Sequence, residues 1–158
     1  MISAFKKLFE VPAQETEAER EHRLQLAAAA LLIETARADF SEDAVEESAL
    51  KSLLCETLAL NQAEVSELVT QASDQLDEAT SLYDFTRVIN DHYSAQQKLA
   101  LIHTMWRVAY ADGRLDKYEE YLIRQVAELT YVPHSDYIRT KLAAQERLSC
   151  AQAPSTDP

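Results

Sequence analysis

The residues ADGRLDKYEE at positions 111–120 repeat the pattern of ADFSEDAVEE at positions 38–47. Both follow A-D-x-x-x-D-x-x-E-E, and the two copies lie 73 residues apart. Each copy comes after an apolar stretch with helical periodicity and comes before another such stretch. The repetition therefore predicts a duplicated helix-loop-helix unit, in which the helix pairs near residues 24–59 and 98–130 are related by an internal pseudo-two-fold axis.

The composition predicts one all-α domain. The chain has 158 residues, a single glycine and four prolines, and it is rich in Ala, Leu and Glu. So few turn-forming residues disfavour hairpins, whereas Ala, Leu and Glu favour helices. We expect a compact single-domain bundle of about seven to eight helices over residues 15–148. We expect an amphipathic N-terminal segment at residues 1–12 and a flexible tail at residues 149–158.

Capping residues locate several helix starts. Asn61 is typical of an N-cap. Ser94 with Gln97 fits the S-x-x-Q capping box, and Ser81 with Asp84 resembles a capping pair. Further helices are predicted near residues 15–38, 43–59 and 62–79, after Asp116, and from Pro133 to about Leu148.

Apolar stretches and cysteines predict a cytoplasmic protein. The longest apolar stretch, residues 26–33, is far shorter than a membrane span. Cys55 and Cys150 lie far apart and form no CxxC motif, which is typical of reduced thiols in the cytosol.

The helix predicted at residues 15–38 carries an apolar stripe that contains Leu24, Ala27, Ala28, Leu31 and Leu32.

The negative charge is concentrated in one part of the sequence. Residues 24–97 contain fourteen acidic and three basic side chains, whereas eight acids balance eight bases from residue 98 onward. Such an acidic region repels phosphates and anionic membrane surfaces, so we expect neither nucleic acid nor membrane as a partner. A basic protein partner or divalent cations fit this charge. Alternatively, the surplus carboxylates keep a small domain soluble.

The repeated acidic pattern has two interpretations. Asp116 and Glu119 stand three apart at a helix start, where they can form a capping box. Capping does not explain Asp39 and Asp112, because a carboxylate at the preceding helix end is disfavoured by the helix dipole. Three carboxylates on one loop can instead bind a hard cation such as Ca²⁺ through oxygen, although the pattern is not an EF-hand. The candidate metal ligands are Asp39, Asp43, Glu46, Asp112, Asp116 and Glu119.

The sequence contains no catalytic motif. There is no G-x-S-x-G, P-loop or H-E-x-x-H, and only Glu19 and His22 have the E-x-x-H spacing of di-iron bundles. His103 lies one turn from Trp106 on a largely apolar helix, which favours a partly buried structural histidine over a catalytic base. We therefore assign no catalytic or cofactor-binding residue. The alternative is a metal-dependent hydrolase or redox enzyme that uses the acidic loops.

The second copy of the pattern also carries a family resemblance. Residues 109–119, AYADGRLDKYE, resemble the A-D-G-x-[hydrophobic]-x-x-x-E signature of the TerB-like superfamily. This superfamily includes the tellurite-resistance protein TerB and the N-terminal domains of DjlA-type co-chaperones. Residues 82–86, LYDFT, and the earlier Ala38-Asp39 add to the resemblance, which covers roughly residues 20–145.

The resemblance implies a compact all-α fold with internal pseudo-symmetry. It also implies a non-enzymatic module for metal-related stress responses or protein interaction. The acidic signature of the family falls on Asp112, Asp116 and Glu119. The first copy has Phe40 where the second has Gly113, and phenylalanine resists a left-handed backbone, so we expect the first loop to be the poorer cation site.

Overall fold

The structure, a computed structural model, describes residues 15–38, 44–111 and 115–152. Within these residues the chain forms seven α-helices and no strand, which confirms the predicted all-α fold. None of the described helices is long and apolar enough to cross a membrane. The helices are α2 (Glu17–Arg37), α3 (Ala44–Leu58), α4 (Gln62–Glu78), α5 (Tyr83–His92), α6 (Ala95–Ala109), α7 (Lys117–Leu129) and α8 (His134–Gln152).

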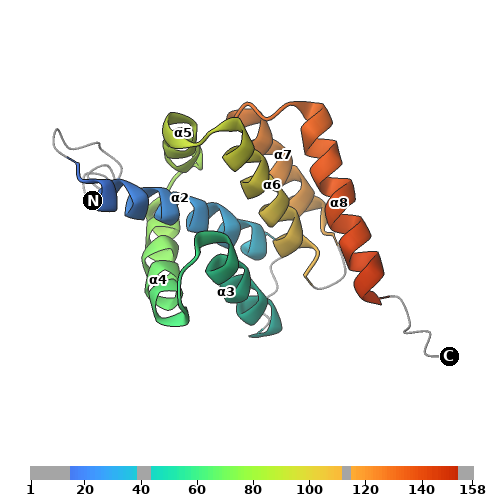
Figure 1. Cartoon of the computed structure of the whole chain (residues 1–158), viewed down its shortest axis with the longest axis horizontal. Helices are drawn as coiled ribbons and strands as arrows, with labels where there is room; N and C mark the ends of the chain where they lie inside the picture. Colours follow the sequence, from blue (N-terminus) through green and yellow to red (C-terminus); the bar gives the residue numbers. More distant parts are fainter. Residues whose placement is uncertain (1–14, 39–43, 112–114, 153–158) are drawn as a thin grey trace.

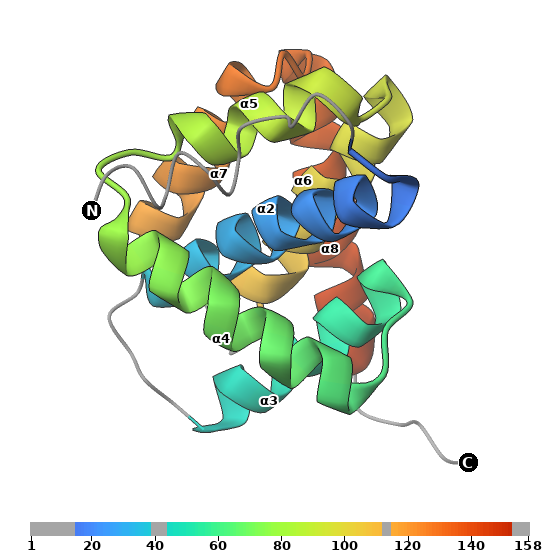
Figure 2. The same cartoon turned by 90° about the vertical axis from the view of Figure 1, so that its left-hand side faces the viewer.

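Helix α2 lies at the centre of the bundle (Figures 1 and 2). It contacts α3, α4, α5, α6 and α7. All eight residues from 26 to 33 are buried, each at most 4% exposed. A helix that is apolar on every side is stable only when it is surrounded. The sequence predicted an apolar stripe on this helix, whereas the structure buries the full circumference of its middle part, residues 26–33.

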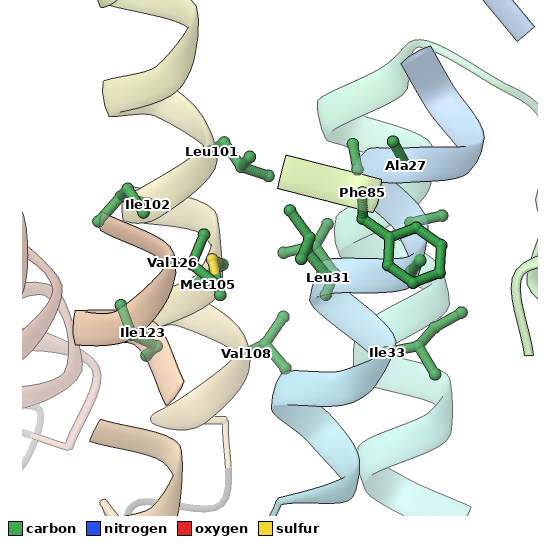
Figure 3. Close-up of a cluster of buried hydrophobic side chains, with 14 of the residues drawn as sticks. Ala27, Leu31, Ile33, Phe85, Leu101, Ile102, Met105, Val108, Ile123 and Val126 are labelled. Atoms are coloured by element: carbon green, nitrogen blue, oxygen red, sulfur yellow. The ribbon is translucent and has the colours of Figure 1, made fainter. Parts of the chain in front are cut away.

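The core continues from α2 to α6. Leu31 from α2 and Met105 and Val108 from α6 lie between the two helices (Figure 3). On another side of α6, the fully buried Trp106 packs on Tyr137 of α8, with 5.3 Å between the ring centroids. Helix α6 therefore joins the central helix to the outer helix α8.

The predicted caps are confirmed at two helix starts and wrong at a third. The Asn61 side chain accepts a hydrogen bond from the Glu64 amide at 2.8 Å. Ser94 and Gln97 form the predicted capping box of α6. At α5 the N-cap is Leu82, which makes no side-chain capping bond. Ser81 lies one residue too early, and its hydroxyl accepts only a 3.4 Å bond from the Tyr83 amide.

The last helix is longer than the sequence suggested. Helix α8 continues to Gln152, past Leu148 and into the segment predicted as a tail. Residues 143–152 contain neither glycine nor proline, so nothing in that stretch stops a helix.

Two helix ends use a left-handed residue that is not glycine. Ala59 follows α3 with φ of 55°, and Tyr131 follows α7 with φ of 60°. In both cases the next amide returns to a carbonyl five residues earlier, from Leu60 to Cys55 at 3.2 Å and from Val132 to Ala127 at 2.9 Å. These are Schellman motifs. Gly113, the left-handed residue that the sequence predicts after α6, lies outside the described residues.

Candidate functional site

The acidic residues at the start of α7 form a capping box. The Asp116 side chain accepts a hydrogen bond from the Tyr118 amide at 2.7 Å, and the Glu119 side chain accepts one from the Asp116 amide at 3.2 Å. Glu119 is only 2% exposed. The fold therefore brings these two predicted ligands together, and both of them cap the helix.

The other predicted ligands lie beyond what the structure describes. Asp39, Asp43 and Asp112 fall outside the described residues, as does the side chain of Glu46. In the described part of the chain, no group of three or more His, Cys, Asp or Glu side chains is placed to hold a metal ion. Cation binding by the repeated pattern thus stays a prediction.

The start of α7 is tied to α8 by contacts that the sequence did not reveal. Glu120, next to the capping residue Glu119, accepts a 2.7 Å hydrogen bond from Lys141 of α8. The Lys141 ammonium also lies 5.6 Å from the centroid of the Trp106 ring. Burial, helped by the Glu120 carboxylate, raises the pKa of Tyr137 to about 12. Through Lys141, the first turn of α7 is therefore linked to the contact of Trp106 on α6 with Tyr137 on α8.

Helix α4 carries five acidic side chains and neither lysine nor arginine. Four of these acids, Glu64, Glu67, Asp74 and Glu78, fall on one side of the helix together with Gln71, by their three- and four-residue spacing. We call these four carboxylates the α4 acidic stripe. All of them are exposed. Among the five acids of α4, only Asp77, beside the stripe, forms an ion pair within the described residues, with Arg37 at 3.0 Å.

The acidic stripe does not help α4 to fold. Asp74 and Glu78 are like charges four residues apart, an arrangement that destabilises a helix. Both also lie toward the C-terminal end, where the helix dipole disfavours negative charge. At the other end Glu64 is favourable, because it accepts a 2.6 Å hydrogen bond from Asn61 and lies near the positive end of the dipole. Helix stability therefore explains only one of the four carboxylates.

Two ion pairs away from the capping box and the stripe shift carboxyl pKa values. Arg23 donates two hydrogen bonds to Glu15, at 2.8 and 3.0 Å, and both side chains are only 5% exposed. The Arg23 guanidinium lowers the pKa of Glu15 and also contacts the His92 ring at 3.0 Å. On α3, the hydrogen bond from Arg107 lowers the pKa of Glu56. Sequence spacing gives no signal for these pairs. Glu15 precedes α2 and lies eight residues from Arg23, and Glu56 and Arg107 lie on different helices.

His103 is half-buried, as the sequence predicted. Burial and the neighbouring Arg107 lower its pKa, so the neutral imidazole is favoured.

An open groove of about 820 Å³ lies between α3 and the start of α4, rather than at the α7 capping box. Its lining mixes polar, charged and apolar side chains, among them Ser52, Glu56 and Leu60.

A family model described as "Tellurite resistance protein TerB" matches residues 25–142. The chain belongs to the TerB family. The match runs from α2 into α8, so it includes the central helix, the α4 acidic stripe and the capping box of α7. No curated protein and no solved structure matches the chain. The protein is therefore a helical domain of a family named after tellurite resistance.

Proposed function

We propose that this TerB-family domain is a non-enzymatic cytoplasmic binding module whose α4 acidic stripe binds a basic segment of a partner protein. The observation that carries the proposal is the stripe itself: exposed carboxylates on a helix without lysine or arginine. Within the described residues, Glu67, Asp74 and Glu78 take part in no ion pair. A partner that supplies lysine or arginine would relieve the repulsion between them.

The stripe is long enough to contact several turns of a partner helix. From Glu64 to Glu78 the helix rises about 21 Å, at about 1.5 Å per residue. A basic helix of similar length, with Lys or Arg at three- and four-residue spacing, can match its charges. His22 of α2 contacts Gln71, in the middle of the stripe, at 3.1 Å. This contact holds α4 against the central helix, so the stripe is presented on a supported surface.

The test compares two variants with the same net charge. The first, Glu67→Gln/Asp74→Asn/Glu78→Gln, neutralises the stripe. The second, Glu128→Gln/Asp136→Asn/Glu146→Gln, neutralises three acids of α7 and α8. Anisotropy of a labelled lysine-rich helical peptide should show binding that weakens with salt, since screening shortens the reach of exposed charges to about 8 Å at physiological ionic strength. Only the first variant should lose the binding. Equal losses in both variants, or binding insensitive to salt, would refute the proposal.

A second candidate ligand is a divalent cation at the α7 loop. It is supported by the proximity of Asp116 and Glu119, with Asp112 four residues before the cap. A carboxylate accepts about four hydrogen bonds, so the capping bond to the Tyr118 amide occupies only part of the acceptor capacity of Asp116. Ca²⁺ takes six to eight oxygen ligands, so the loop backbone and water would have to complete the shell. In this proposal Asp112, Asp116 and Glu119 hold the ion, and Asp39, Asp43 and Glu46 form the weaker copy.

Two variants separate the cap from the ligand. Asp116→Ser keeps an N-cap but removes a carboxylate, and Asp112→Asn removes a carboxylate without touching the cap. If the loop binds Ca²⁺, the ion should raise the melting temperature of the wild type, and both variants should lose that gain. Calorimetric titration with Ca²⁺, Mg²⁺, Mn²⁺ and Zn²⁺ identifies the preferred ion. Unchanged melting of the wild type with all four ions would leave only the capping function, and turnover of a substrate would favour the enzyme alternative.

A further inference from the structure

Helix α8 forms the outer edge of the bundle, on the opposite side from α4 (Figures 1 and 2). Its inward side buries Tyr137, Thr140 and Ala144 against the rest of the domain. Its outward side exposes Leu142, with 52% of the residue accessible, and Arg139, with 68% of its side chain accessible. The other outward residues, all exposed, are Ser135, Ala143, Glu146 and Cys150.

Charge decides which face a second copy of the chain can approach. Each copy has a formal net charge of −12, and residues 24–97 hold most of it. Two copies therefore repel each other strongly through their α2–α5 side. Helix α8 contains Asp136 and Glu146 but also Arg139, Lys141 and Arg147. It is the side on which such repulsion is weakest and on which an exposed leucine is available.

The outward residues of α8 have a symmetric order. Arg139 and Glu146 stand seven residues apart, about two turns, on the same side of the helix. Leu142 and Ala143 lie midway between them. When the helix is paired with an antiparallel copy of itself about this midpoint, Arg139 lies opposite Glu146 of the second copy, and the same pair forms again across the axis. Leu142 then packs on the small Ala143 of the other copy.

We propose that two copies of the protein associate through their α8 helices, antiparallel, about a two-fold axis between Leu142 and Ala143. A parallel pair would instead place Arg139 beside Arg139 and Glu146 beside Glu146, which is repulsive. Glu146 forms no ion pair in the described residues, and Arg139 pairs only with Asp136, at 2.8 Å on the surface. Glu146 is therefore available to a second copy, and the exposed Arg139 can pair with it by exchanging or sharing its surface contact with Asp136.

The dimer is weak because one helix pair forms it. Stable interfaces bury about 800 Å² on each partner, more than a single exposed helix face supplies. We expect association to be detectable at about 0.1–1 mM protein. Under these conditions, sedimentation equilibrium should give a mass that rises with concentration from 17.8 kDa toward twice that value. A constant monomer mass over the whole range would overturn the proposal.

Charge reversal tests the pairing of Arg139 with Glu146. Arg139→Glu and Glu146→Arg should each weaken the dimer, because each places like charges across the axis. The double variant Arg139→Glu/Glu146→Arg restores both pairs in reversed polarity and should recover the association. Reversal of Arg124, which is on α7 and pairs within its own helix with Glu128, is the control and should leave the dimer unchanged. Failure of the double variant to recover would overturn the proposed contact.

A disulfide tests the antiparallel register. In the proposed pairing, residue 135 lies opposite Cys150 of the second copy. Ser135→Cys in a Cys55→Ser background should give a covalent dimer on mild oxidation, and adding Cys150→Ser should abolish it. Within one chain the two positions are about 22 Å apart along α8, too far for a disulfide. A dimer that forms through Cys150 alone, without the cysteine at position 135, would indicate a parallel pair and overturn the proposal.

Discussion

Ala59 shows how a single residue closes a turn in a chain that has one glycine. Its positive φ lets the Leu60 amide reach the Cys55 carbonyl and so end α3. A left-handed backbone is unfavourable for alanine, because its Cβ approaches the following carbonyl oxygen. The contacts of Leu60 and Cys55 with the hydrophobic core hold the turn in place.

We therefore expect Ala59→Gly to increase the free energy of unfolding by about 0.5–1 kcal/mol, because glycine adopts this backbone without a steric penalty. Ala63→Gly, inside the first turn of α4, is the control and should decrease stability by up to about 1 kcal/mol. Urea denaturation of both variants measures the difference. A loss of stability in Ala59→Gly would contradict the left-handed conformation at this position.

The ion pair of Glu15 with Arg23 predicts a loss of stability in acid. The hydrogen bond from Arg23 holds the pKa of Glu15 in the folded protein below its usual value. Such a group stabilises the fold above its unfolded pKa, and the stabilisation is lost as the pH falls through the folded pKa. Glu15→Gln should therefore be less stable than the wild type at neutral pH, and the difference should shrink below pH of about 4. Melting temperatures of the wild type and the variant between pH 3 and 7 check this, with Glu17→Gln as a control at an exposed carboxylate.

At the scale of elements, α4 is held by tertiary contacts rather than by its own charges. Val65, Leu68, Ala72 and Leu76 are buried along one face, and this burial offsets the repulsion along the acidic stripe. The two ends of the helix differ in their electrostatics, because the dipole favours acids at the start and disfavours them at the end.

Neutralising the two ends should thus have opposite effects. Glu78→Gln should raise the free energy of unfolding by about 0.3–1 kcal/mol, and Glu64→Gln should lower it by a similar amount. Both differences should decrease in 1 M salt, where screening is strong. The measurement is chemical denaturation at low and high salt. If both variants changed stability in the same direction, the dipole argument would be wrong.

At the scale of the whole molecule, α2 determines the architecture because five other helices pack on it. Leu31 is fully buried at the contact of α2 with α6 (Figure 3). We expect Leu31→Ala to cost about 2–5 kcal/mol, through lost burial and the cavity that remains. Leu142→Ala, which removes the same atoms from an exposed site, should change the stability of the monomer by less than about 0.5 kcal/mol. Thermal unfolding at low protein concentration compares the two.

The pseudo-two-fold relation is also a property of the whole molecule, and it stays a prediction. It requires the α2–α3 pair to superpose on the α6–α7 pair, with residues 38–47 and 111–120 at equivalent places. A least-squares superposition of the two pairs in an experimental structure tests this. Unrelated crossing angles would leave the 73-residue spacing as a coincidence.

The sequence by itself determined the helical class, most helix starts and the acidic character of α4. These features depend on local chemistry. Caps satisfy backbone amides within one turn of the helix, and the number of acidic side chains in a segment does not depend on the fold. The capping box of Asp116 and Glu119 was predictable for this reason. Only the tertiary structure decided that residues 26–33 of α2 are buried on all sides. An apolar stretch of eight residues is compatible with either a one-sided stripe or a fully surrounded helix until its neighbours are placed. Long-range pairs such as Arg23 with His92 and Lys141 with Glu120 depend on which helices become neighbours, and packing alone determines that.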